Sequence, residues 1–187
     1  MEGFISKPAA ERRVFFEQTE ARIGLPARSV EKDFWVCWTL RQLFELPDFG
    51  DHLTFKGRTS LSKAWKLIER FSEDIDLVFG KEFLGFGNER NPEAAPSKGK
   101  RKEAVKALKE ECSRRIQEDL APALQKRLQA ALPSTENWRL YPDETDPDHQ
   151  TLMFDYRPMS CRSRRPFVSI ACQAKSVSLV SGASKWR

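Results

Sequence analysis

The sequence has few of the residues that most metal centres and covalent frameworks require. It contains two histidines, and its four cysteines are far apart and form no C-x-x-C pair. We therefore expect no zinc or histidine metal site, no nucleophile–histidine pair and no disulfides, which indicates a reducing compartment. The sequence also lacks a run of about 18 apolar residues and an N-terminal signal-peptide pattern, which favours a cytoplasmic protein without a membrane span.

Acidic residues are absent from residues 156–187, where seven Lys or Arg occur, although the whole chain carries a formal charge of only +5. A second basic cluster comes at the start of a predicted helix and consists of Lys100, Arg101, Lys102, Lys106 and Lys109. Such regions can bind nucleic acid by neutralising phosphates, or they can simply form solvated surface. The sequence leaves both interpretations open.

The most informative motifs of the sequence lie in residues 56–79, KGRTSLSKAWKLIERFSEDIDLVF. Residues 53–56 have the pattern of a strand, and Gly57 follows where the chain must turn. Thr59 or Ser60 can cap the next helix. The apolar residues of that helix fall at helical spacing and predict one buried stripe: Leu61, Ala64, Trp65 and Ile68.

After this helix the pattern changes to a period of two, which predicts a strand. Ile75, Leu77 and Phe79 then share one face, and Asp74, Asp76 and Val78 share the other. Residues two apart on a strand have Cα atoms roughly 6.5–7 Å apart, so the two carboxylates can converge on a hard cation. The pattern favours bound Mg²⁺, with Mn²⁺ as a substitute, although two acids on a solvated strand face would give the same sequence.

The glycine turn and the aspartates complement each other chemically. A turn that leads into a helix N-terminus offers backbone N–H groups and a positive dipole end to phosphates. Gly57 and Ser60 would supply this donor cradle, and Asp74 and Asp76 would supply the metal clamp. The combination predicts a site for a nucleoside triphosphate and Mg²⁺.

These residues also carry a family resemblance. Gly57 followed by Asp74-Ile75-Asp76 resembles the signature of DNA-polymerase-β-type nucleotidyltransferases, and KGRTSLSK with ERFSEDIDL is similar to AbiEii/AbiGii-like toxins of type IV toxin–antitoxin systems. The resemblance begins at VEKDFW, residues 30–35, and extends to about Tyr156. It implies transfer of a nucleotide from an NTP to an acceptor, such as a tRNA 3′ end, in phage defence, and it implies a cognate antitoxin. It also implies nucleotide-binding positions at Gly57, Arg58, Thr59, Ser60, Lys63 and Ser72.

The sequence departs from the family pattern at the third carboxylate. Related enzymes carry this acid on a strand beside the Asp-x-Asp strand, and the resemblance places that strand at residues 167–172. Ala171 stands where the acid is expected, and Asp155 is the last acid in the chain and the one late candidate to replace it as a catalytic residue. The alternative function is therefore a catalytically impaired protein that binds RNA or an antitoxin.

Two further departures concern the glycine turn and the end of the chain. Arg58 occupies a position that is usually small, where its guanidinium could grip a phosphate or its bulk could block the cradle. The family usually continues into a helical C-terminal region, so the resemblance leads us to interpret the acid-free tail SVSLVSGASKWR as an altered or truncated end.

The remaining patterns predict an α+β fold in one compact unit. Helices are expected at residues 8–23 and from a Ser29 cap to residue 44, with Glu31, Lys32 and Asp33 in the first turn of the second helix. A long helix at 98–131 should kink or restart at Pro122. Strands at 138–141, 152–156 and 167–172 would complete a small mixed sheet with flanking helices. We divide the chain into N-terminal helices (1–50), a nucleotidyltransferase-like core (51–175) and an irregular basic tail (176–187).

Overall fold

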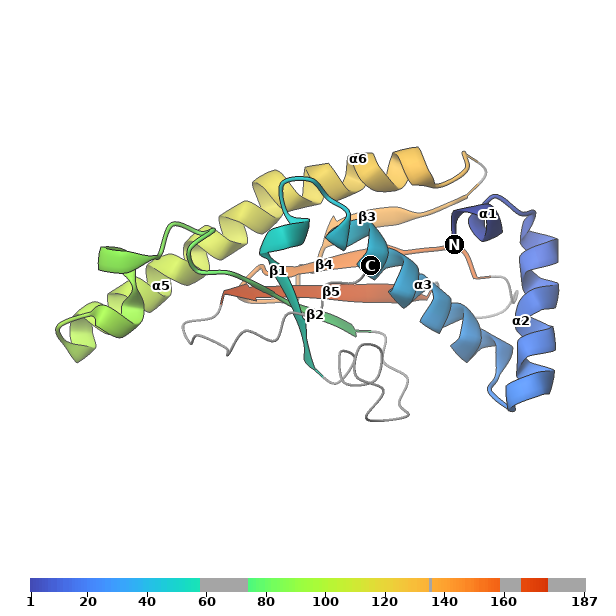
Figure 1. The fold of residues 1–187 in the computed structure, drawn as a ribbon, viewed down its shortest axis with the longest axis horizontal. Helices are drawn as coiled ribbons and strands as arrows, with labels where there is room; N and C mark the ends of the chain where they lie inside the picture. The colour runs from blue at the N-terminus through green and yellow to red at the C-terminus, as the bar shows by residue number, and fades with distance from the viewer. Residues whose placement is uncertain (58–73, 135, 159–165, 175–187) are drawn as a thin grey trace.

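The computed structural model describes residues 1–57, 74–134, 136–158 and 166–174. It shows the predicted α+β architecture, in which helices flank a five-stranded mixed sheet (Figure 1). The first helices are α1 (Glu2–Ile5), α2 (Ala9–Ile23) and α3 (Ala27–Phe44). The predicted helix between Gly57 and Asp74 lies outside the described residues. Two short 3₁₀ turns, η2 (Asn88–Arg90) and η3 (Pro92–Ala94), lie between β2 and the next helix.

The sheet has the order β1-β2-β5-β4-β3. Its strands are β1 (Leu53–Lys56), β2 (Asp74–Phe79), β3 (Arg139–Pro142), β4 (Thr151–Asp155) and β5 (Phe167–Ala174), all within two residues of the predicted positions. β1 pairs antiparallel with β2, β2 parallel with β5, and the remaining pairs are antiparallel. The last strand in sequence therefore lies in the middle of the sheet, directly beside the Asp-x-Asp strand.

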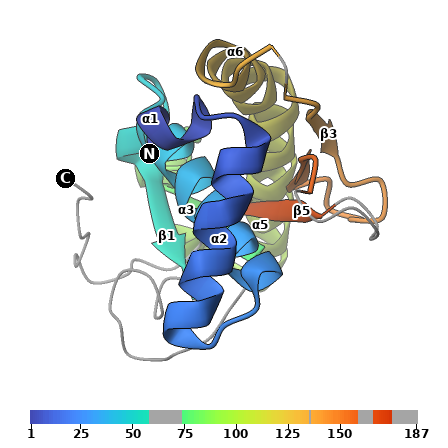
Figure 2. The same cartoon turned by 90° about the vertical axis from the view of Figure 1, so that its right-hand side faces the viewer.

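Helices cover one face of this sheet. Ile75, Leu77, Ile170 and Phe154 on that face are fully buried, which accounts for the apolar half of the period-two pattern. α3 contacts β2 and β5. The long helical arm of residues 98–131 contacts β5 and β3. Seen from the end, α2 crosses in front of α3 and extends this layer (Figure 2). Aromatic contacts fix α3 on β4, with Trp35 stacked on Tyr156 at a ring-centroid distance of 4.8 Å.

The start of α3 differs from the prediction. The helix begins at Ala27 with Pro26 at the N-cap position, so Ser29 lies inside the first turn and is not the cap. This shift moves Glu31 into the second turn, where it is buried. The prediction that Glu31 lies in the first turn of this helix was therefore wrong.

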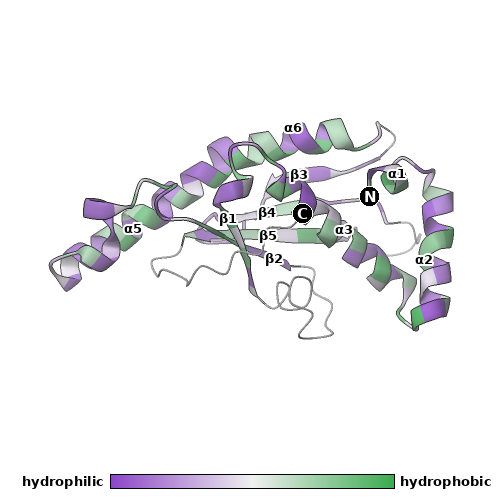
Figure 3. Ribbon diagram, viewed as in Figure 1, coloured by the Kyte–Doolittle hydropathy of each residue, from purple (hydrophilic) through white to green (hydrophobic). Residues whose placement is uncertain are grey.

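The long charged helix is present but is not uniform. It consists of α5 (Lys98–Arg114), a π-helical stretch η4 (Arg115–Leu120) and α6 (Ala121–Ala131). The irregular stretch lies just before Pro122, because proline donates no hydrogen bond and its ring clashes with the carbonyl four residues earlier. Leu108, Cys112 and Ile116 form the buried side of this helix. Figure 3 shows the corresponding alternation of hydrophilic and hydrophobic segments along α5.

Candidate functional site

Asp74 and Asp76 lie on the sheet face opposite the helices. Asp74 is exposed and Asp76 half-buried, while Ile75 between them is fully buried. The predicted alternation along this strand is thus confirmed. Neighbouring strands add further side chains to this face, which we call the Asp76 face: Lys56, Asp74, Asp76, Ser169, Ala171 and Gln173.

Gly57 lies directly against the Asp76 carboxylate. The antiparallel pairing of Lys56 with Asp76 brings the end of β1 beside the aspartate, and Gly57 has a φ of +77°. A Cβ built on Gly57 would be 2.1 Å from Asp76 Oδ2 and 2.9 Å from its Cγ. Only glycine satisfies both the positive φ and this close approach. The structure therefore brings together the glycine turn and one aspartate of the motif.

The position beside Asp76 on the next strand is Ala171. Parallel pairing of β2 with β5 places Ser169 beside Asp74 and Ala171 beside Asp76, at the usual strand spacing of about 4.8 Å. A methyl group offers no ligand to a metal. Within the described part of the chain, no group of three or more His, Cys, Asp or Glu side chains is placed to hold a metal ion.

The two aspartates nevertheless suit a magnesium ion. Mg²⁺ commonly binds one or two carboxylates and completes its octahedral shell with water and substrate phosphates. Asp74 and Asp76 supply two such carboxylates from one strand face, beside a glycine turn that leaves no Cβ in the way. These two residues would hold the metal, and Ala171 beside Asp76 supplies no third ligand.

Asp155 lies on the same sheet face but in different surroundings. Asp155 is the last residue of β4 and lies opposite Phe167 of β5, two residues before Ser169. β4 is roughly 10 Å across the sheet from β2, because β5 lies between them. The Asp155 carboxylate accepts hydrogen bonds from Arg139 Nη2 at 2.7 Å and from the Tyr141 hydroxyl at 3.1 Å. Burial, the hydrogen bond to Asp155 and the charge of that carboxylate raise the pKa of Tyr141. The structure thus does not place Asp155 next to Asp74 and Asp76, and a catalytic role for it stays a prediction.

A contact that sequence patterns did not predict spans the Asp76 face. Lys56 Nζ donates a hydrogen bond to Gln173 Oε1 at 2.6 Å, from β1 to β5 across the intervening β2. The strand pattern of residues 53–56 could have placed Lys56 on one face of the sheet. It could not have identified Gln173, because the partner depends on the strand order.

The other predicted nucleotide-binding residues, Arg58, Thr59, Ser60, Lys63 and Ser72, lie outside the described residues, as does Cys161. Among the described cysteines, Cys37, Cys112 and Cys172 are free thiols. Burial raises the pKa of Cys112 to about 12 and that of Cys172 still further. These two thiols are therefore poor nucleophiles at neutral pH.

The comparison with family models decides the affiliation. Residues 38–169 match the model described as "Nucleotidyl transferase AbiEii toxin, Type IV TA system", which is more than two thirds of the chain. The chain belongs to the AbiEii toxin family. The matched region contains Gly57, Asp74, Asp76 and Asp155, and it ends two residues before Ala171. No curated protein and no solved structure matches the chain.

The AbiEii match confirms the resemblance to a toxin-type nucleotidyltransferase, and the observed sheet fits such a core. The matched region begins later than the resemblance did, at residue 38 and not at Val30, and extends further, to residue 169. In the described ranges, no helix is long and apolar enough to cross a membrane.

Proposed function

We propose that this AbiEii-family chain is a toxin that transfers a nucleotide from an NTP to an RNA acceptor such as a tRNA 3′ end. The contact between the Gly57 turn and the Asp76 carboxylate carries the proposal. It joins a turn whose backbone can approach phosphate to a strand whose two carboxylates can hold a metal. Such a pairing suits a reaction on a triphosphate more than it suits a purely structural turn.

Each residue of the site would have a distinct role. Asp74 and Asp76 would bind Mg²⁺ or Mn²⁺, and the ion would neutralise charge on the phosphates. Gly57 and the following turn would bind the triphosphate through backbone N–H groups, assisted by Lys63 one helical turn later. Membership of a toxin–antitoxin family supports a cognate antitoxin as partner. The proposal further includes a cytoplasmic role in antiviral defence.

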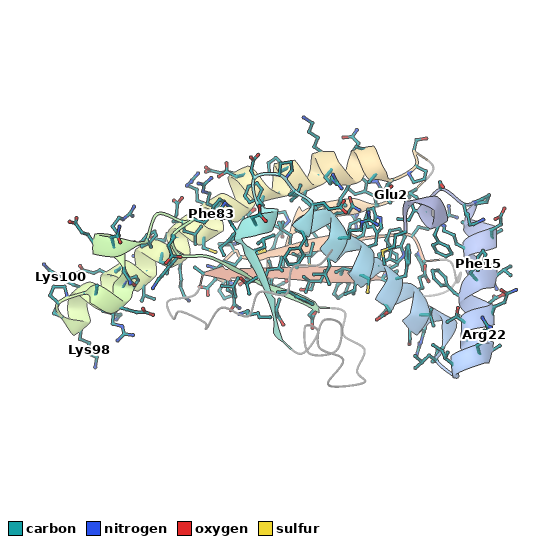
Figure 4. All side chains as sticks on the ribbon, viewed as in Figure 1. Glu2, Phe15, Arg22, Phe83, Lys98 and Lys100 are labelled. Atoms are coloured by element: carbon teal, nitrogen blue, oxygen red, sulfur yellow. The ribbon has the colours of Figure 1, made fainter. Side chains whose placement is uncertain are left out.

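A second candidate function is binding without efficient transfer. Ala171 beside Asp76 and the engagement of Asp155 with Arg139 and Tyr141 favour it, because both leave the metal clamp with two carboxylates. Such a protein would retain the fold and bind RNA or its antitoxin. The basic start of α5 provides one surface for RNA, since Lys98 and Lys100 lie at the free end of the helix (Figure 4).

Incorporation of labelled NTP into a tRNA pool tests the proposal. We expect the wild type to transfer weakly, Asp76→Ala to abolish transfer, and Ala171→Glu to increase it by adding a carboxylate beside Asp76. The control is Asp51→Asn, which removes an exposed carboxylate before β1 and should leave transfer unchanged. Absence of transfer in the wild type and in Ala171→Glu, despite RNA or antitoxin binding, would favour the second function.

A further inference from the structure

Lys56 is the feature of the Asp76 face that the proposed roles leave unexplained. It is the last residue of β1 and lies opposite Asp76 in the register of β1 and β2. Its ammonium group, however, makes its hydrogen bond on another strand. It reaches across β2 to the Gln173 amide oxygen on β5, 2.6 Å away. The side chain is therefore stretched across the face that carries both aspartates, and its charge is held on the far side of β2.

The partner of this ammonium is neutral. Among the ion pairs of the described residues, none involves Lys56, although Asp76 is its neighbour in the sheet. An ammonium has three N–H donors, and the bond to the Gln173 amide leaves its charge without an ion-pair partner among the described residues. An ion pair with Asp76 would instead occupy the carboxylate that the metal requires. The arrangement keeps the cation and the carboxylate apart on one surface.

The charges on this face indicate a role for the Lys56 ammonium group. Among the described residues of this face, Asp74 and Asp76 are acidic, Ala171 is neutral and Lys56 is a cation. In the strand register, Lys56 is the described cation directly opposite an Asp-x-Asp residue. It also lies immediately before the glycine turn. A cation at this position would attract phosphate oxygens at the same time as the clamp attracts a metal.

We propose that Lys56 contacts the phosphates of the nucleotide and that Gln173 holds its ammonium in place for this purpose. The inference rests on the proposed nucleotide-transfer function and adds Lys56 as a binding residue with Gln173 as its positioning residue. A role restricted to linking β1 and β5 would require the hydrogen bond but not the uncompensated charge. The two roles therefore differ in how phosphate affinity responds to charge.

Binding of inorganic triphosphate and of NTP, measured by calorimetry in the presence of Mg²⁺, tests this assignment. Lys56→Met should weaken both by about tenfold or more, as expected for loss of a charge-assisted hydrogen bond. The matched control is Lys126→Met, which removes an exposed lysine of α6 and should leave both affinities unchanged.

Gln173→Glu provides a second variant that keeps the link between the strands. The new carboxylate would pair with Lys56 and neutralise it, so triphosphate affinity should fall although the lysine and the fold are intact. Gln173→Leu should have a smaller effect, because it frees the ammonium without neutralising it. A structural link alone predicts lower thermal stability for Lys56→Met but unchanged triphosphate affinity in Gln173→Glu, and that result would overturn the proposal.

The same measurements separate this inference from the proposed function. Unchanged triphosphate affinity in Lys56→Met, together with transfer that depends on Asp76, would sink the Lys56 assignment alone. Triphosphate binding that depends on Lys56, without any transfer to RNA, would sink the transfer function alone. A wild-type chain that binds neither triphosphate nor NTP would overturn both.

Discussion

Gly57 and Gly24 have nearly the same backbone conformation but different surroundings. Their φ angles are +77° and +72°, and a Cβ on Gly24 would meet nothing within 4 Å, whereas one on Gly57 would collide with Asp76. Gly57→Ala and Gly24→Ala should both lose about 1–2 kcal/mol of stability from backbone strain. Only Gly57→Ala should also weaken Mn²⁺ binding, because it displaces the Asp76 carboxylate. Chemical denaturation and Mn²⁺ titration measure the two effects, and equal Mn²⁺ affinities would contradict the site geometry.

Individual site residues were predictable from sequence where the information was local. The period-two pattern was sufficient to place Asp74 and Asp76 on one face, and the positive φ of Gly57 follows from the turn it makes. The partners of Asp155 were not predictable, because Arg139 and Tyr141 reach it through the pairing of β3 with β4. No pattern within either strand specifies that register.

At the scale of elements, a buried ion pair ties α2 to the segment before β3. Arg12 is 1% exposed and donates through Nη2 to Glu136. Arg12→Met should cost about 3–5 kcal/mol, since it leaves the Glu136 carboxylate in poorly hydrated surroundings. Arg13→Met is the matched control: this arginine pairs with Glu17 at the exposed surface and should cost at most about 1 kcal/mol. Urea denaturation checks both values, and similar losses would show that burial of the pair has little effect.

The turn between β3 and β4 depends on Asp146. Its carboxylate accepts hydrogen bonds from the backbone N–H groups of Asp148 and Gln150 and from the Thr151 hydroxyl. Burial alone would raise the pKa of Asp146, but these bonds outweigh burial and lower it. A lowered folded-state pKa contributes stability above the unfolded-state pKa and loses it as pH falls through the folded value.

Asp146→Asn should therefore reduce stability at neutral pH by about 1–3 kcal/mol, because a neutral amide is the weaker acceptor. The difference from wild type should persist down to about pH 4 and shrink at lower pH, where Asp146 becomes protonated. Thermal denaturation between pH 2.5 and 7 measures this dependence. A constant difference over that range would show that the charge of Asp146 does not stabilise the turn.

The type of each element was easier to predict than its ends. Periodicity identified α2, α3, the α5–α6 arm and all five strands. It misplaced the start of α3, because Pro26 can begin a helix as effectively as Ser29 can cap one. It placed the irregularity of the long helix at Pro122, whereas the structure has it at residues 115–120, which include the carbonyl that the proline ring clashes with.

At the scale of the whole molecule, the strand order could not be predicted, and it determines the site. A mixed sheet was expected, but its order β1-β2-β5-β4-β3 depends on the packing of α3 and the α5–α6 arm over one face. By inserting β5 beside β2, this order places Ala171 next to Asp76 and Gln173 within reach of Lys56. Residues more than 90 positions apart thus share one face.

The same order predicts how the whole molecule responds to metal. Asp74 and Asp76 share a strand face and would bind the same cation, so a divalent ion that binds only the folded chain should stabilise it. A ligand at 100 times its Kd adds about 2.7 kcal/mol, which corresponds to a rise in Tm of roughly 5–10 °C for a chain of this size. Saturating Mg²⁺ or Mn²⁺ should therefore raise the Tm of the wild type, and Asp74→Asn should abolish most of the rise. Glu144→Gln, which alters an exposed carboxylate in the β3–β4 turn, should retain it. An equal metal-induced rise in Asp74→Asn and wild type would show that the ion binds elsewhere and that the two aspartates do not form the clamp.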